Sequence, residues 1–184
     1  MEAVVPTEGY WATQLPIDHA IPFLEGFVVF YVSWAPVLVA TGLYLLFRDP
    51  DNFRAYMKTL AITFLASTIF CLLVPNGQDL RPAVMPRDNI FCAWVSLLYS
   101  MDTNTNVFPS VHVVGVMAFL FALWHTPSVR RWRWPGLALG ILIILSTLFI
   151  RQHAVLDVLA SLVLSAVAYL IVYRPWKGAL HGTH

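Results

Sequence analysis

A histidine and an aspartate stand together at the start of the last long apolar stretch of the chain. His153 and Asp157 are four positions apart, which places them on one face of a helix, about one turn from each other. A carboxylate there can accept a hydrogen bond from one imidazole nitrogen and leave the other nitrogen free as a nucleophile. Residues 158–173 carry no charge, and a carboxylate next to such an apolar segment is costly enough to indicate function. We therefore favour a functional pair over a structural hydrogen bond.

The segment Pro109-Ser110-Val111-His112 has the composition of a helix start. Proline is tolerated where the N–H group would be unpaired, and serine is a good capping residue. The free N–H groups and partial positive charge at such an N-terminus suit a phosphate group. His112, in the predicted first turn, would face that anion and donate a proton to a leaving oxygen as a general acid.

Arginines complete a set of residues suited to phosphate chemistry. Arg81 is the expected clamp, because its planar fork binds two phosphate oxygens at once. Arg151, two residues before His153, is a second candidate, and Arg87 is assigned to lipid head groups. The combination of arginine, serine, two histidines and a carboxylate predicts a site that binds and transfers phosphoryl groups.

The composition tells which elements must position these residues. Of the 184 residues 59% are hydrophobic and 11% charged, whereas a soluble domain has roughly 25% charged residues. A membrane-spanning helix needs about 20 apolar residues. The excess lies in five runs, which predict an all-α polytopic membrane protein with a bundle of about five transmembrane helices: Phe23–Phe47, Thr59–Pro75, Val107–Trp124, Pro135–Ile150 and Val158–Tyr173.

The distribution of basic residues predicts the orientation. Cytoplasmic loops are enriched in lysine and arginine. Eight of the eleven basic residues follow the first, third and fifth runs, namely Arg48, Arg54, Lys58, Arg130, Arg131, Arg133, Arg174 and Lys177. With five spans, this predicts an extracytoplasmic N-terminus and a cytoplasmic C-terminus. Arg81, His112 and His153 then share the extracytoplasmic side.

The chain divides into three predicted parts. Residues 1–22 form an irregular or interfacial lead-in, residues 23–173 the membrane domain, and residues 174–184 a cytoplasmic tail. In the long connection before the third run, Ile90–Tyr99 is expected to lie along the membrane surface. The mixture of Arg and Trp at 130–135 fits a membrane anchor better than a nucleic-acid site. Cys71 and Cys92 are treated as structural.

Three motifs resemble those of the type 2 phosphatidic acid phosphatase and vanadium haloperoxidase superfamily. They are Arg81-Pro82, Pro109-Ser110-Val111-His112 and His153-x-x-x-Asp157. The resemblance covers roughly residues 60–170. It implies that His153 forms a phosphohistidine oriented by Asp157 and that His112 protonates the leaving alcohol. Arg81 and the Ser110 region would bind the phosphoryl oxygens, and no metal or other cofactor is implied.

The chain departs from the family pattern at three positions. Val74 stands where the family usually has lysine, Thr147 where it has arginine, and Val111 where it has glycine. Two phosphate-binding cations are thus missing, and Arg151 is the candidate to replace one. The segment from Ser146 to His153, together with 108–112, resembles more closely the branch of inositol phosphorylceramide synthases.

These observations favour a lipid phosphatase in a bacterial plasma membrane that acts on a phosphomonoester or diphosphate lipid at the outer face. The alternative is a phosphotransferase that passes a phospho-head group to a polyol or other alcohol, held by Asp102–Asn106. A transporter or non-catalytic lipid-binding protein would carry polar residues through to the inner face, and the inner halves of the runs are expected to be apolar. A zinc site of His112, His153 and Asp157 and a soluble haloperoxidase are weaker alternatives.

Overall fold

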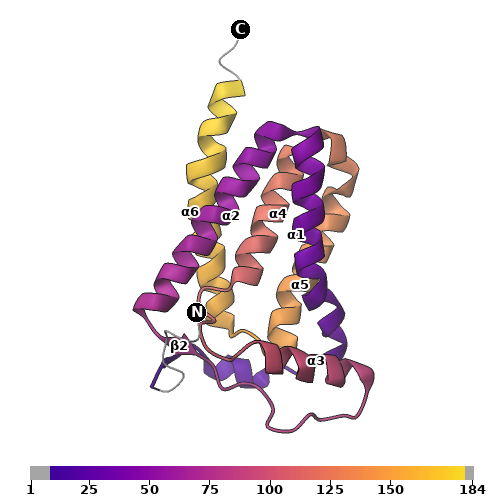
Figure 1. Cartoon of the computed structure of the whole chain (residues 1–184), viewed down its shortest axis with the longest axis vertical. Helices are drawn as coiled ribbons and strands as arrows, with labels where there is room; N and C mark the ends of the chain where they lie inside the picture. The colour runs from indigo at the N-terminus through magenta and orange to yellow at the C-terminus, as the bar shows by residue number, and fades with distance from the viewer. Residues whose placement is uncertain (1–8, 181–184) are drawn as a thin grey trace.

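A computed structural model describes residues 9–180 and has the predicted all-α architecture. Long helices lie side by side along the longest axis of the molecule and alternate in direction (Figure 1). They are α1 (Val28–Arg48), α2 (Pro50–Leu73), α4 (Val111–His125), α5 (Arg133–Phe149) and α6 (Val155–Leu180). We call the end where α4 and α6 begin the His153 end, and the end where α2 begins the Asn52 end.

Four segments in the described part of the chain are long and apolar enough to cross a membrane: Glu25–Arg48, Pro50–Leu73, Pro127–Phe149 and Val155–Arg174. The chain is thus a multi-pass membrane protein by length and composition, with one candidate span fewer than predicted. The exception is α4, whose 15 residues extend only about 22 Å, against about 30 Å of bilayer core.

The short helix α4 is the centre of the bundle. It packs against α1, α2, α5 and α6, and most of its residues are buried. Close approach to α5 depends on Gly140, where an added Cβ atom would lie 3.1 Å from Cγ1 of Val116. Because neighbouring helices cover α4, its length is not set by contact with lipid.

Two helices extend beyond the predicted apolar runs. Helix α2 begins at Pro50, nine residues before Thr59. Asp49 caps it, because the Asp49 side chain accepts a hydrogen bond from the Asn52 backbone N–H group at 3.2 Å. Helix α6 continues to Leu180, so the segment predicted as a tail begins as helix, and residues 181–184 lie outside the described part. Hydropathy marks only the apolar part of each helix, and capping and good helix-forming residues carry the helix further.

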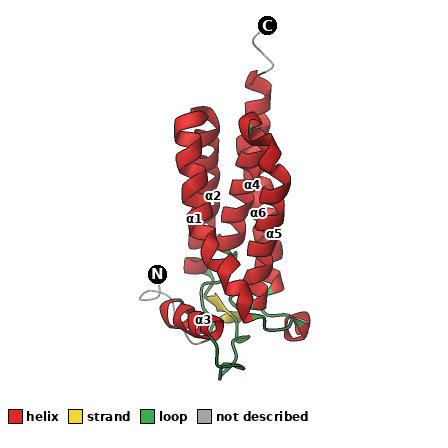
Figure 2. Ribbon diagram, turned by 90° about the vertical axis from the view of Figure 1, so that its right-hand side faces the viewer, coloured by secondary structure: helices red, strands yellow, loops and turns green. Residues whose placement is uncertain are grey.

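The His153 end is covered by shorter elements and the loops that join them, within residues 9–27 and 74–106, and we call these segments the cover. They are β1 (Trp11–Ala12), η1 (Pro16–Ala20), η2 (Glu25–Phe27), β2 (Asn76–Gly77) and α3 (Ile90–Met101), and η3 (Pro127–Trp132) joins α4 to α5 at the opposite end. Helix α3 lies across the ends of the long helices (Figure 2). Ile90, Trp94, Leu97 and Met101 expose one apolar face, which fits the interfacial position predicted for this segment.

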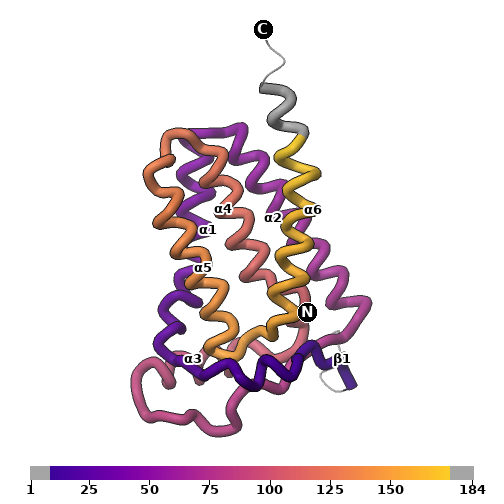
Figure 3. The backbone as a smooth tube through the Cα atoms, turned by 180° about the vertical axis from the view of Figure 1, so that it is seen from behind, coloured from indigo at the N-terminus to yellow at the C-terminus, as the bar shows by residue number. Residues whose placement is uncertain are grey.

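The described part of the predicted lead-in, residues 9–22, lies across the same end (Figure 3). Strand β1 pairs in parallel with β2. The carbonyl group of Ile21 accepts a hydrogen bond from Arg151, and Leu24 donates its N–H group to the Phe149 carbonyl oxygen at 3.0 Å. Residues 1–8 of the lead-in lie outside the described part.

One expectation about the interior is wrong. The halves of α2 and α6 toward the Asn52 end are not uniformly apolar, because Asn52, Thr59 and Tyr173 are buried there. Buried polar side chains continue along both helices toward the His153 end, namely Thr63, Ser67, Ser161 and Ser165. Their hydroxyl groups mostly bond the carbonyl groups of their own helix, as Thr59 does with Ala55 at 2.9 Å. Such small hydroxyl residues allow membrane helices to pack closely.

Candidate active site

The turn between α5 and α6 positions His153 and Asp157. The N–H groups of Gln152 and His153 both donate to the Thr147 carbonyl oxygen, at 2.9 and 3.1 Å. Asp157 Oδ2 accepts the Ala154 N–H group at 2.8 Å and lies 3.4 Å from His153 Nδ1. His153 is 7% exposed and Asp157 is fully buried. The carboxylate therefore lies behind the imidazole, as predicted. The predicted helix face is wrong, however, because His153 belongs to the turn before α6 and only Asp157 lies in the helix.

Contacts from distant segments hold this turn in place. Arg151 adopts a left-handed backbone conformation, with φ +52°. Its carbonyl oxygen accepts a hydrogen bond from Gln78 Nε2 at 2.9 Å. Its guanidinium donates to the carbonyl oxygens of Leu80 and Ile21, both at 3.0 Å. Arg151 thus fastens the turn to its cover in this structure, and its predicted role as a phosphate ligand stays a prediction.

Ser110 begins α4 as predicted. It is the N-cap residue, and its hydroxyl oxygen accepts the Val113 N–H group at 3.4 Å. Its carbonyl oxygen accepts a hydrogen bond from the Ser161 hydroxyl of α6 at 3.2 Å. This contact joins the start of α4 to the first turns of α6, so the N-terminus of α4 lies beside the turn that carries His153.

His112, in the first turn of α4, lies within a group of aromatic rings. Its ring centroid is 5.7 Å from that of His153, 4.3 Å from Tyr31 and 4.4 Å from Trp34. Gly115 permits the approach of α1, because an added Cβ atom would lie 2.6 Å from Trp34 Nε1. The start of α4 and the turn before α6, which are distant in sequence, therefore bring the two histidines close together.

Arg81 lies beside these residues with its guanidinium engaged. It donates to the carbonyl oxygens of Asp102 at 2.8 Å and Thr103 at 2.7 Å, and to Gln152 Oε1. The guanidinium also lies 4.4 Å from the ring centroid of Tyr99. Burial lowers the pKa of Arg81 from its ordinary value, and a guanidinium group stays charged in proteins. Burial raises the pKa of Tyr99 to about 12, and its protonated hydroxyl donates to the Ile150 carbonyl oxygen at 2.6 Å.

Unpaired polar atoms gather at the His153 end. Nine buried side-chain N or O atoms in the described residues have no hydrogen-bond partner, and seven belong to this end. They are Trp34 Nε1, Arg81 Nε, Asn106 Oδ1, His112 Nδ1, Gln152 Nε2, His153 Nδ1 and Asp157 Oδ1. Buried polar groups are normally paired, so this concentration indicates a binding site for a polar ligand. The histidine pair, the carboxylate and the arginine make phosphoryl transfer the chemistry that it fits.

Sequence reasoning did not identify several residues of this region. Asp18, in η1, is buried, and its Oδ1 atom accepts the Val155 N–H group at 2.8 Å, so it caps α6. Tyr31 and Trp34 lie in an apolar helix, where aromatic residues are common for reasons of packing alone. Gln152 adjoins His153 in sequence, and this adjacency was the only available signal.

Two other predicted residues have structural contacts. Arg87 forms an ion pair with Glu25. In the segment Asp102–Asn106, Asn104 donates to the Gln78 carbonyl oxygen at 2.7 Å, and Thr103 and Thr105 hydroxyls lie 2.9 Å apart. These contacts hold the cover together, and a role of the segment in binding an alcohol stays a prediction. Among residues 9–180 no three His, Cys, Asp or Glu side chains are grouped to hold a metal ion, so nothing supports the zinc alternative.

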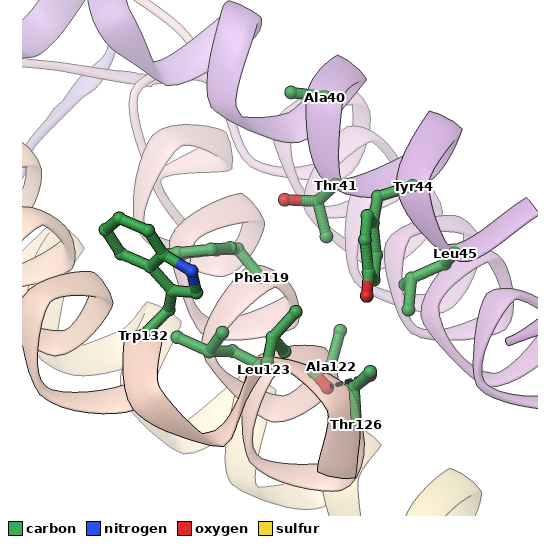
Figure 4. A pocket seen from close by; sticks show the side chains of 10 residues that line it. Ala40, Thr41, Tyr44, Leu45, Phe119, Ala122, Leu123, Thr126 and Trp132 are labelled. Atoms are coloured by element: carbon green, nitrogen blue, oxygen red, sulfur yellow. Dashed lines mark hydrogen bonds between the residues drawn. The ribbon is translucent and has the colours of Figure 1, made fainter. Parts of the chain in front are cut away.

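An apolar pocket occupies the opposite end of the bundle. Figure 4 shows Thr41 and Tyr44 of α1, Leu123 of α4, Thr126 directly after α4, and Trp132 of η3 around it. Its lining contains neither histidine nor carboxylate, and Leu123 lies about 16 Å along α4 from His112. The pocket is therefore separate from the histidine pair and suits an apolar occupant.

Comparisons with known proteins point to one family. A family model described as the PAP2 superfamily matches residues 11–171, which include the three motifs and the helices that carry them. Neither the search of the curated proteins nor that of the solved structures found a match.

Proposed function

Because the chain belongs to the PAP2 superfamily, whose members are phosphoric ester hydrolases or related phosphotransferases, we propose that it is an integral membrane lipid phosphatase. The observation that carries the proposal is the arrangement of His112 and His153. Their ring centroids lie 5.7 Å apart, and Asp157 lies behind His153 in a region of unpaired polar atoms. The substrate is a phosphomonoester or diphosphate lipid.

In the first step His153 attacks the phosphorus atom through Nε2. The N–P bond forms as the bond from phosphorus to the lipid oxygen breaks, and His112 gives its proton to that oxygen. Asp157 lies beside His153 Nδ1 and stabilises the positive charge that develops on the ring. Arg81 and the N-terminus of α4 at Ser110 offset the negative charge on the phosphoryl oxygens.

In the second step water replaces His153. His112, now neutral, takes a proton from the water, whose oxygen bonds to phosphorus as the N–P bond breaks. Inorganic phosphate leaves, and both histidines return to their starting states. An alcohol in place of water would give a phosphotransferase. This second candidate is favoured by the burial of His153, which is 7% exposed and so has little contact with bulk water.

Turnover of a substrate panel tests the proposal. Purified protein in detergent is given phosphatidic acid, phosphatidylglycerol phosphate, an isoprenyl diphosphate, or phosphatidylinositol with diacylglycerol, and free phosphate and lipid products are followed together. Phosphate release that depends on His153 is expected. A head-group-transfer product with little free phosphate would instead establish the phosphotransferase, and full activity of His153→Ala would refute the mechanism.

The orientation of the site is part of the proposal, with the His153 end outside the cell and the Asn52 end in the cytoplasm. Val84, 82% exposed in the cover, and Arg130, exposed in η3, offer a matched pair for cysteine labelling. The two native cysteines are buried and give a low background. In intact cells a membrane-impermeant reagent is expected to label Val84→Cys and not Arg130→Cys, and the opposite pattern would invert the topology.

A further inference from the structure

Gln152 lies between the candidate phosphate clamp and the candidate nucleophile. It is 2% exposed, and its Oε1 atom accepts a hydrogen bond from Arg81 Nη2. This contact fixes which way the amide points, because a guanidinium donates hydrogen bonds and cannot accept them. The Nε2 atom is then a buried donor without a partner, directly before His153 in the chain. Arg81 Nε is a second buried donor without a partner in the same pair of side chains.

A second buried glutamine shows what a purely structural role looks like here. Gln78 is fully buried, its Nε2 atom donates to the Arg151 carbonyl oxygen at 2.9 Å, and its Oε1 atom accepts the Leu80 N–H group at 2.6 Å. Both ends of that amide are occupied within the protein. Gln152 uses one end only, and leaving a buried donor unpaired costs free energy that a ligand can recover.

Two cations of the family pattern are missing from this chain, so other groups must donate hydrogen bonds to the phosphoryl oxygens. Val74 and Thr147 stand where the family pattern has lysine and arginine. Thr147 is buried and its hydroxyl group donates to the Ile144 carbonyl oxygen at 2.7 Å. Arg151 directs its guanidinium to the carbonyl oxygens of Leu80 and Ile21. Arg81 is the cation that contacts Gln152, and further N–H donors must come from uncharged groups.

We propose that Gln152 is a phosphate-binding residue of this site, whose Nε2–H group donates to a phosphoryl oxygen beside Arg81. This inference rests on the function proposed above. The glutamine amide takes a place that a cation would otherwise fill, and it aligns the guanidinium through its oxygen while it binds substrate through its nitrogen. One amide thus couples the position of Arg81 to the position of the phosphoryl group.

Binding of orthovanadate, a phosphate analogue, tests the inference in the purified full-length protein. Gln152→Leu is expected to weaken vanadate binding and to lower kcat/KM by about 10- to 100-fold, as for loss of a hydrogen bond to a charged group. Gln14→Leu is the matched control, because Gln14 belongs to the cover and accepts the Asp79 N–H group away from the histidines. That control should bind vanadate within about twofold of wild type, and thermal unfolding establishes that each variant is folded.

Gln152→Glu separates substrate binding from mere support of Arg81. Its carboxylate can still accept from Arg81 but would repel the phosphoryl oxygens, so at pH 8 vanadate binding should be weaker than in Gln152→Leu. Wild-type affinity of this variant at that pH would overturn the inference and assign Gln152 to support alone. Wild-type affinity of Gln152→Leu would also overturn it, while His153-dependent turnover would leave the proposed function standing. Absence of both vanadate binding and turnover in the wild type would refute the proposed function itself.

Discussion

The two ends of the bundle contain similar residues in different states of pairing. At the Asn52 end, the Asn52 amide donates to the Ala122 carbonyl oxygen at 2.9 Å and to the Thr126 hydroxyl at 2.6 Å, and it accepts from the Tyr173 hydroxyl at 3.2 Å. His125 Nδ1 lies 2.8 Å from the Phe121 carbonyl oxygen. At the His153 end, the Gln152 amide has one free end, and His112 Nδ1 has no hydrogen-bond partner.

Residue type therefore does not separate a structural cluster from a reactive one in this protein. His125 packs on Tyr173 with ring centroids 4.4 Å apart, much as His112 packs on Tyr31 at 4.3 Å. The difference is that the partners at the Asn52 end satisfy one another, so the cluster stabilises helix packing. The buried atoms at the His153 end are costly while they lack hydrogen bonds, and hydrogen bonds to a polar ligand would remove that cost.

The largest expected effect is that of His153→Ala. Removing the nucleophile should lower kcat by at least about 10⁴-fold, because the covalent step has no substitute in the site. The fold should stay intact, since Asp157 keeps the hydrogen bond from the Ala154 N–H group and the backbone hydrogen bonds of the turn to Thr147 remain. Phosphate release and thermal unfolding are measured on the same preparation. The equivalent change at the Asn52 end, His125→Ala, should leave kcat unchanged, and a similar loss there would remove the distinction between the two ends.

Replacement of the general acid should have a smaller effect that depends on the leaving group. His112→Ala is expected to lower turnover of a lipid substrate by about 10²–10⁴-fold. The loss should be much smaller for p-nitrophenyl phosphate, whose leaving oxygen needs no protonation. Equal losses for both substrates would indicate that His112 positions the phosphoryl group and does not transfer a proton.

The aromatic contact on His112 should have a moderate effect. An aromatic face stabilises a neighbouring cation by about 0.5–2 kcal/mol, so Tyr31→Leu should reduce kcat about 3- to 30-fold. Because His112 acts in its protonated form, loss of this stabilisation should move the basic limb of the pH–rate profile to lower pH. Tyr31→Phe keeps the ring and serves as the control. An unshifted profile in Tyr31→Leu would limit Tyr31 to packing.

The smallest expected effect on activity is that of a change at the Asn52 end. Asn52→Leu removes hydrogen bonds to α4 and α6, and buried hydrogen bonds between membrane helices contribute about 1–2 kcal/mol at most. The free energy of unfolding should fall by about that amount, with kcat/KM per folded molecule within about twofold of wild type. Denaturation in detergent provides the first measurement and the phosphate assay the second. A large loss of activity without a loss of stability would mean that the two ends are coupled.

Much of the fold follows from the sequence alone. The excess of apolar residues identified the helices of the bundle, since a chain with so few charges cannot cover a surface facing water. The pair Pro109-Ser110 marked the start of α4, where Ser110 does cap the helix. The spacing of His153 and Asp157 predicted their proximity, and their side chains lie 3.4 Å apart, but His153 belongs to the turn before α6 and its place depends on that turn.

Contacts between distant segments could be decided only by the tertiary structure. The approach of His112 to His153 requires α4 and α6 to meet, and the ring of Tyr31 comes from α1. The Gln78 amide is fully hydrogen-bonded and the Gln152 amide is not, and this difference depends on which donors and acceptors surround each of them. Local sequence fixes residue types and spacing along one helix, whereas the pairing of buried polar groups is a property of several helices packed together.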